Sequence, residues 1–427
     1  MADERGVLRG VAWRDICPWL IIFRTFRLAK SLPLLFLATL GVVAIPAGWQ
    51  VGEALFVSEQ ALQADSDFAR FVEQQGLWPG QPGASPAPNQ GRLPQSIRDV
   101  VLTSPSPLEA IYVRLIEPVV RLLKSRLTVT QAAYAAWGFL WTLLIWGFFG
   151  GAITRIAVVR LGREEPLGLG DAVRHAAARL GAHVGSPLLP LVGVALLALP
   201  IYGLGLLARS DGGLLLAGIF WVAALFGGLL IVVLLLGLLF GWPLMWGTLA
   251  AEERGDVFEA FSRSYSYTFQ RPLHYLFYGA LATLYGGLAW LLVYHFSEGV
   301  IRFTEWAAAW GAGPERWAEI ARLRFDPSLG VGASRLAVLL IDLGTGLVRT
   351  IAVGFSYSLF WCLAAAAYLL LRWNVDQTEF DEVFVPSQTG RYQLPPVDGV
   401  EALEEGPPGE AAETPPAVTS ESSPPQA

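Results

Sequence analysis

The residues best suited to chemistry lie in one polar segment, EERGDVFEAFSRSYSYTFQRPLHYLFY, at positions 252–278. Serine and tyrosine alternate there beside arginine, and guanidinium groups of this kind bind lipid phosphates or a protein partner at the cytoplasmic face of a membrane. The alternative is an interfacial helix that its aromatic side chains merely anchor. The residues expected to contact lipid or a partner are Phe258, Phe261, Arg263, Tyr265, Tyr267 and Arg271.

The other reactive residue types show no catalytic or metal-binding pattern. The four histidines are scattered, and they neither form an H-E-x-x-H motif nor accompany cysteines. No nucleophile elbow, phosphate-binding loop or dinucleotide fingerprint occurs in a suitable context. The cysteines Cys17 and Cys362 are too few for a disulfide framework. We therefore expect no catalytic residue, metal or cofactor, a protein that is not an enzyme, and no nucleic-acid partner.

Composition indicates the setting in which these residues lie. Hydrophobic residues make up 54% of the 427 residues and charged residues only 15%, whereas soluble domains carry about 25% charge. Several apolar runs reach the roughly 20 residues that cross about 30 Å of hydrocarbon as a helix. Many of the 16 tryptophans lie near the ends of these runs, as in an aromatic belt. The predicted fold is all-α, a polytopic membrane protein with about six transmembrane helices.

The predicted organisation alternates membrane-spanning and exposed parts. In chain order it comprises a cytoplasmic or interfacial segment (1–32), a first transmembrane helix (33–56), an extracytoplasmic stretch with a Pro/Gly linker and an amphipathic helix (57–130), a four-helix membrane core with two elbows (131–295), an extracytoplasmic or interfacial stretch (296–349), a last transmembrane helix (350–372) and a cytoplasmic tail (373–427) that is disordered from about residue 386.

Within the core, the apolar run 214–249 is predicted to form one long helix from Leu214 to about Phe240, which Pro243 in the following GWP breaks or kinks. The even number of spans places both termini on the same side of the membrane. The basic N-terminus predicts that this is the cytoplasmic side of a bacterial cell membrane. The basic residues are divided almost equally between the two sides, so the positive-inside rule adds little support. The predicted spans hold no ionisable residue near mid-membrane, as Arg155 and Arg349 lie at span ends, and the glycine pairs Gly147–Gly151 and Gly237–Gly241 favour close helix packing.

Two polar segments between spans are predicted as amphipathic elbow helices. Sixteen residues separate Asp171 from Pro187, and sixteen separate Asp256 from Pro272. When the segments are aligned on Gly-Asp, four apolar positions coincide, and Leu180 then corresponds to Tyr265. This match suggests a span–elbow–span repeat over about 131–207 and 214–292. The unequal loops before the elbows count against it.

The segments EAFSRSYSYTFQRPLHYLFY and YLLLRWNVDQTEFDEVF resemble parts of uncharacterised bacterial multi-pass proteins. The span–elbow–span layout is distantly similar to the six-helix membrane domain attached to some bacterial glycerophosphodiester phosphodiesterases. The resemblance covers about residues 130–385 and implies a membrane fold. It supplies no catalytic residue, since no phosphodiesterase domain accompanies it here.

Two hypotheses for function follow from the sequence. The first is a non-enzymatic scaffold, assembly or envelope-maintenance factor, whose partners are membrane lipids and a protein at the cytoplasmic elbows and tail. The alternative is a transporter of a lipid-like or small apolar solute. A polar, water-accessible cavity between the repeats would favour the transporter, and tightly packed repeats would favour the scaffold.

Overall fold

The computed structural model describes residues 17–79, 107–124, 127–253 and 255–385, and within these ranges all regular structure is helical. The expected all-α fold is confirmed, because six of the described helices are long and apolar enough to cross a membrane. They are α3 (Leu32–Phe56), α8 (Val129–Gly162), α10 (Leu180–Leu207), α12 (Trp221–Ala251), α14 (Pro272–Ala312) and α16 (Ala333–Asp376). The described residues as far as Phe384 belong to one compact unit, and the tail expected to be disordered lies outside the described residues.

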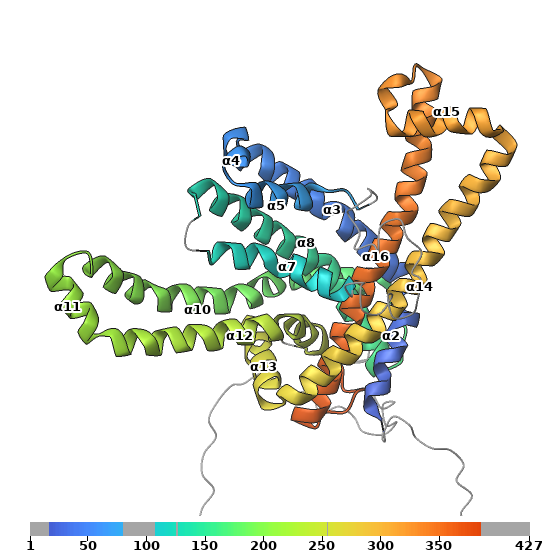
Figure 1. Cartoon of the computed structure of the whole chain (residues 1–427). Helices are drawn as coiled ribbons and strands as arrows, with labels where there is room; N and C mark the ends of the chain where they lie inside the picture. The colour runs from blue at the N-terminus through green and yellow to red at the C-terminus, as the bar shows by residue number, and fades with distance from the viewer. Residues whose placement is uncertain (1–16, 80–106, 125–126, 254, 386–427) are drawn as a thin grey trace, which may run out of the picture. The chain divides into compact units, whose positions relative to one another are not determined.

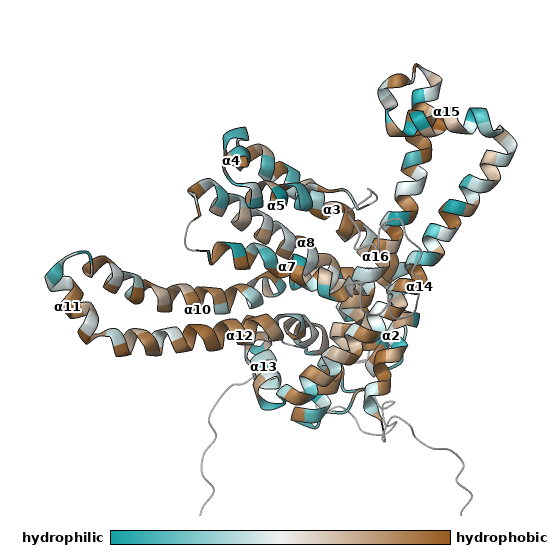
Figure 2. Cartoon of the chain, in the orientation of Figure 1, coloured by the Kyte–Doolittle hydropathy of each residue, from teal (hydrophilic) through white to brown (hydrophobic). Residues whose placement is uncertain are grey.

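The six long helices pack as three hairpins, α3 with α8, α10 with α12 and α14 with α16 (Figure 1). Short helices join or flank them: α2 (Ile21–Ala29), α4 (Glu59–Ala64), α5 (Ser66–Gly76), α7 (Pro107–Leu122), α9 (Leu169–Ala178), α11 (Asp211–Ile219), α13 (Val257–Gln270) and α15 (Pro314–Phe325). Helices α11 and α15 lie at the tips of the second and third hairpins, whereas α13 lies at the opposite end of its neighbours (Figure 1). Figure 2 shows the α10–α12 hairpin apolar along nearly its whole length.

Glycine allows the first hairpin to close tightly. A Cβ atom on Gly138 would lie 1.9 Å from the ring of Trp49, and one on Gly48 would lie 2.0 Å from Nε1 of Trp141. The indole of Trp141 also donates to the carbonyl of Ala44 at 3.1 Å. Helices α3 and α8 therefore approach each other closely enough for indole rings to rest on the facing backbone, which is the packing that small residues permit between membrane helices.

Helix α12 differs from the sequence-based expectation at both ends. The predicted helix is interrupted at Phe220, which separates α11 from α12. Helix α12 then continues through Pro243 to Ala251. Proline at position 243 cannot donate to the carbonyl of Leu239 four residues earlier. The hydroxyl of Tyr112, from α7, donates to that carbonyl instead. Because a side chain from another helix satisfies the freed acceptor, the proline does not end the helix.

The two elbows form helices α9 and α13, but only the second matches its expected limits. The carboxylate of Asp256 accepts the amide of Glu259 at 2.7 Å, which caps α13, and Pro272 begins α14 as expected. The first elbow breaks at Arg179, so that Pro187 lies inside α10. The carbonyl of His183, which Pro187 leaves without a backbone donor, accepts the indole N–H of Trp246 at 3.0 Å.

Both glycine pairs of the long helices contact residues of the elbows or of the turn that follows. Gly147 contacts Leu180, Gly151 contacts His183, Gly237 contacts Tyr265, and Gly241 contacts Ser264 and Thr268. Under the alignment on Gly-Asp, Leu180 and His183 correspond to Tyr265 and Thr268. The two halves thus make equivalent contacts. The repeat itself stays a prediction.

Candidate functional site

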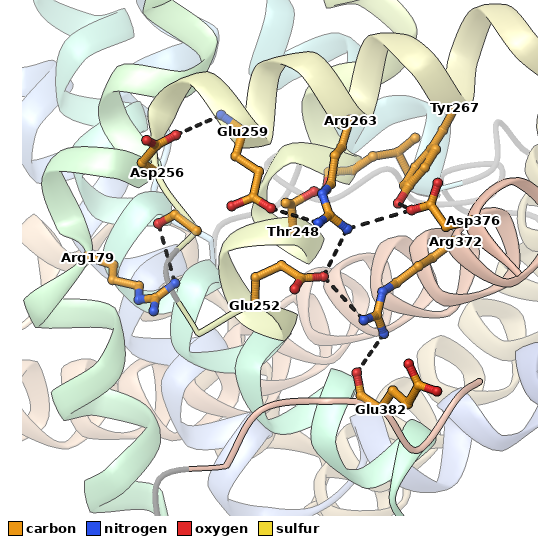
Figure 3. Close-up of polar contacts among 12 residues, drawn as sticks. Arg179, Thr248, Glu252, Asp256, Glu259, Arg263, Tyr267, Arg372, Asp376 and Glu382 are labelled. Atoms are coloured by element: carbon orange, nitrogen blue, oxygen red, sulfur yellow. Dashed lines mark hydrogen bonds and ion pairs between the residues drawn. The ribbon is translucent and has the colours of Figure 1, made fainter. Parts of the chain in front are cut away.

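A polar cluster joins the second elbow to the ends of α12 and α16 (Figure 3). Arg263 of α13 lies 3.1 Å from Glu252 at the end of α12, 2.8 Å from Glu259 on its own helix and 3.6 Å from Asp376 at the end of α16. Burial acts to lower the pKa of Arg263, but the nearby carboxylate of Glu252 outweighs it and the pKa is raised. Arg263 therefore stays charged and holds three carboxylates together.

A second arginine and a phenol complete this cluster. Arg372 of α16 lies 3.3 Å from Glu252 and donates to the carbonyl of Glu382 at 2.8 Å. The hydroxyl of Tyr267 donates to Asp376, and burial raises the pKa of this phenol, so the proton stays on Tyr267. The acids and bases of the cluster are thus paired with one another. These pairs join the second elbow to the ends of α12 and α16.

Basic side chains from α8 and α9 cap the end of α12. Arg155 donates to the carbonyl of Ala250, while Nε2 of His175 and Nη1 of Arg179 lie 3.1 Å and 3.0 Å from the carbonyl of Leu249. The last carbonyls of a helix have no partner within it and carry partial negative charge, which these groups balance. Burial, aided by the charge of Arg155, lowers the pKa of His175 to about 3, so its neutral ring donates from Nε2.

The chain after α16 crosses the same end of the bundle as a strap, residues 377–384. Arg155 donates to the carbonyl of Phe384 at 2.6 Å, and Arg163 donates to that of Val383 at 3.0 Å. The amide of Phe384 donates to the carbonyl of Ala251 at 3.0 Å. The strap is therefore fixed to α8 and to the end of α12. We call this end of the bundle, with α9, α13 and the strap, the elbow end.

The structure divides the six predicted contact residues into two groups. Arg263 and Tyr267 lie in the paired cluster, Tyr265 donates to the carbonyl of Leu234 at 2.5 Å, and the half-exposed ring of Phe261 packs 4.3 Å from that of Tyr265. Phe258 is 68% exposed, and Arg271, at the junction of α13 and α14, is exposed. Of the six residues, only these two are exposed. Contact of any of the six with lipid or a partner stays a prediction.

Sequence analysis did not find an apolar cavity of about 370 Å³ between α7, α8, α10 and α12. Apart from Thr142, its lining side chains are apolar, and they include Val119, Leu143, Leu191, Leu239, Trp242 and Trp361. Helix α7 packs along α8, and its Tyr112 reaches the carbonyl of Leu239 near the middle of α12. The expected interfacial position of α7 stays a prediction. The signal in the sequence was the apolar face 115, 116, 119, 120 and 123, which has the spacing of one side of a helix.

The cavity lies at the level of the two proline positions described above. Pro187 and Leu239 both line it, as does Trp246, whose N–H bonds the carbonyl that Pro187 frees. Tyr112 satisfies Leu239 in the same way. The carbonyls that Pro187 and Pro243 free are therefore both paired with side chains. The largely apolar lining suits an apolar ligand better than a polar solute.

Among the residues that the structure describes, no three His, Cys, Asp or Glu side chains are grouped so that they could hold a metal ion. Comparison of the chain with models of protein families, with curated proteins and with solved structures finds no match. The resemblance to bacterial multi-pass proteins and to the phosphodiesterase-linked membrane domain therefore stays a prediction. The six long apolar helices indicate an integral, multi-pass membrane protein.

Proposed function

We propose that this protein is a non-enzymatic membrane scaffold that binds a lipid, with an acyl chain of that lipid in the apolar cavity. The cavity is the observation that carries the proposal. Its volume of about 370 Å³ falls within the range of roughly 300–1,000 Å³ that is usual for small-molecule sites. Four of the helices that line it, α8, α10, α12 and α16, are long enough to span the membrane, so lipid chains are the molecules at highest local concentration.

The lining also supports lipid over a water-soluble solute. A lipid chain gains little hydrophobic free energy by moving from the bilayer into a protein, because the bilayer is already apolar. Retention of one chain therefore rests on shape and dispersion contacts, which the rings of Trp242, Trp246 and Trp361 supply in quantity. Transport of a polar solute would be favoured by a polar cavity, and the lining of this cavity is mostly apolar.

The polar groups at the elbow end support a structural role over catalysis. Arg263, Glu252 and Asp376 are engaged with one another, and Arg155 and His175 cap a helix. Catalysis needs an acid, base or nucleophile directed at a substrate position. In this proposal the elbow end faces the cytoplasm and holds the bundle rigid around the bound chain.

Native mass spectrometry of protein purified in a mild detergent tests the proposal. Leu191 lines the cavity, whereas Leu196, on the same helix, is exposed. Leu191→Trp should fill the cavity and abolish retention of lipid. Leu196→Trp adds the same bulk on the outer surface, and it should retain lipid as the wild type does. In the wild type, photo-activatable lipids should crosslink to α7 and α12, and the crosslinked positions should be the residues that line the cavity.

Two results would overturn the proposal. One is equal lipid retention by the wild type and both variants, and the other is crosslinking confined to the outer surfaces of α10 and α14. Reconstituted vesicles that carry a fluorescent phospholipid separate a static scaffold from a lipid transporter. Movement of lipid between leaflets that Leu191→Trp abolishes would support the transporter, whereas retention without movement would support the scaffold.

A further inference from the structure

In the outer half of the α14–α16 hairpin, several charged side chains pair between the helices, while many apolar side chains face outward. We call this half the arm, and it comprises residues 294–312, α15 and residues 333–349. Between its helices, Arg324 lies 2.6 Å from Glu305 and 2.6 Å from Asp342, and Arg349 lies 2.8 Å from Glu298. The exposed residues on the outer faces include Phe296, Phe303, Trp310, Leu336, Leu343 and Leu347.

This arrangement is the reverse of that in a water-exposed hairpin, which buries apolar side chains in its seam and presents charges to solvent. Charged groups that pair inside a helical hairpin while apolar groups face outward are typical of helices surrounded by lipid. Phe296 and Phe303 are each 73% exposed. Exposure of such rings along two neighbouring helices to water would be costly, at about 25 cal/mol per Å² of apolar surface.

The outer surface of the arm continues the surface of the predicted fifth span without a break. Exposed apolar residues recur at every fourth position along α14, at Leu284, Leu288, Leu292, Phe296 and Val300. This row of exposed apolar residues continues past His295, the expected end of the span, and stays apolar on both sides of it. The surroundings of the span, which are lipid, therefore extend along the same row.

Helix α16 provides an independent observation. Only 17% of its most apolar 18-residue window is buried. Most residues between Thr350 and Leu371 are buried, so this window must include mainly residues of the arm. An apolar window of α16 that belongs mainly to the arm is thus largely exposed. In a water-exposed extension the opposite would hold.

We propose that the arm lies in the membrane leaflet remote from the elbow end, with its outer faces against lipid and its tip among the lipid headgroups. Leu273 and Trp310 are 37 positions apart in α14, which is about 56 Å along a helix. The bilayer with both headgroup regions is about 40–45 Å thick. A tilt of about 40°, at the upper end of the observed range, brings 56 Å of helix into about 43 Å of membrane.

The polar residues of the arm agree with this depth. Arg302, which is exposed, lies 29 positions after Leu273, and at the same tilt this is about 33 Å along the membrane normal. Its long side chain can reach the phosphates from there. At the tip, α15 lies across the ends of both long helices (Figure 1) and exposes Glu315, Arg316 and Glu319, as expected of a helix in the headgroup region.

Spin labels at single cysteines test the proposal in nanodiscs. In a background that carries Cys17→Ser and Cys362→Ala, labels would replace Leu292, Phe296, Phe303 and Trp310 on the outer face, with Ala318 of α15 as the exposed control. Oxygen collides with labels in lipid, and a water-soluble nickel chelate collides with labels in water. We expect Leu292→Cys, Phe296→Cys and Phe303→Cys to be accessible to oxygen and protected from nickel. Trp310→Cys should show intermediate depth, and Ala318→Cys should be accessible to nickel.

Two results of this measurement would contradict the proposal. Nickel accessibility at Phe303→Cys equal to that at Ala318→Cys would show that the arm stands in water. Protection of Phe303→Cys from both reagents would show that a protein surface covers the arm, either a second copy or a partner. Each of these outcomes overturns the lipid assignment. As a further check, Arg302→Gln should move the Trp310→Cys label measurably in depth in nanodiscs of phosphatidylglycerol, and less in those of phosphatidylcholine, because its anchor is an anionic headgroup.

Discussion

The carbonyl of Leu239 loses its backbone donor because of Pro243 and gains a side-chain donor from Tyr112. Substitution of these two residues therefore tests the structure. Tyr112→Phe removes the donor and keeps the ring that packs against Trp242. Leaving a buried carbonyl unpaired costs about 1–3 kcal/mol in proteins generally, and hydrogen bonds between membrane helices average about 0.6 kcal/mol with a maximum near 1.7. We expect Tyr112→Phe to reduce the free energy of unfolding by about 1 kcal/mol.

Pro243→Ala supplies the missing backbone N–H, which can bond Leu239 within α12. Tyr112→Phe should then cost much less in the Pro243→Ala background than in the wild type. The coupling free energy of the double-mutant cycle should be about 1 kcal/mol. Unfolding in mixed micelles with increasing dodecyl sulfate, followed by tryptophan fluorescence, measures each of the four proteins.

The carbonyl of Phe240, next to Leu239, provides a matched control. Tyr275 donates to the carbonyl of Phe240 at 2.6 Å, and position 244, a leucine, can also donate to that carbonyl. Tyr275→Phe should therefore show a small cost and no coupling to Pro243→Ala. Strict additivity of Tyr112→Phe and Pro243→Ala would refute the reasoning, as would equal coupling in the control.

Three further predictions concern the caps, the packing and the orientation. The pKa of His175 is about 3 in the folded chain against about 6.5 in an unfolded one, so the melting temperature should fall as pH decreases from about 6.5 toward 3. His175→Gln, which keeps an N–H for the capped carbonyl, should flatten this dependence, and parallel slopes would exclude the assignment. Gly138→Ala should destabilise by about 1–3 kcal/mol through overpacking, while Gly203→Ala, where nothing lies within 4 Å, should leave the melting temperature unchanged or slightly raised. A membrane-impermeant thiol reagent should label Ser262→Cys in inside-out vesicles but not in intact cells, and the reverse result would invert the orientation.

The fold class could be predicted because it depends on composition and on the length of apolar runs. Six spans follow from these two quantities alone. The course of α12 through Pro243 could not be predicted, because the group that satisfies the freed carbonyl is 127 positions away in the sequence. The break at Phe220 and the division of the first elbow at Arg179 have no proline or strong cap to announce them. Local signals identify a helix but not the partner that permits its irregularities.

The sequence predicts Arg263 and Tyr267 as lipid or partner contacts, and that prediction stays untested. Their arrangement in a paired cluster could not be predicted. Both depend on Asp376, which lies 109 positions after Tyr267 and is brought to the elbow by α16. The cavity could not be predicted for the same reason, since it requires α7 to pack along α8. Pairing over long sequence separations is a property of the packed bundle.

The strap at residues 377–384 has a consequence for anything attached to the end of the chain. Arg155 and Arg163 hold its carbonyls, and the carbonyl of Ala251 holds its last amide, so Phe384 is fixed beside the end of α12. A peptide, tag or partner carried beyond residue 385 is therefore tethered to the elbow end. A second contact made there is intramolecular, and short tethers give effective concentrations in the millimolar range. Weak affinity for the elbows is enough to keep such a partner in place, and release requires only that one of the two contacts be lost.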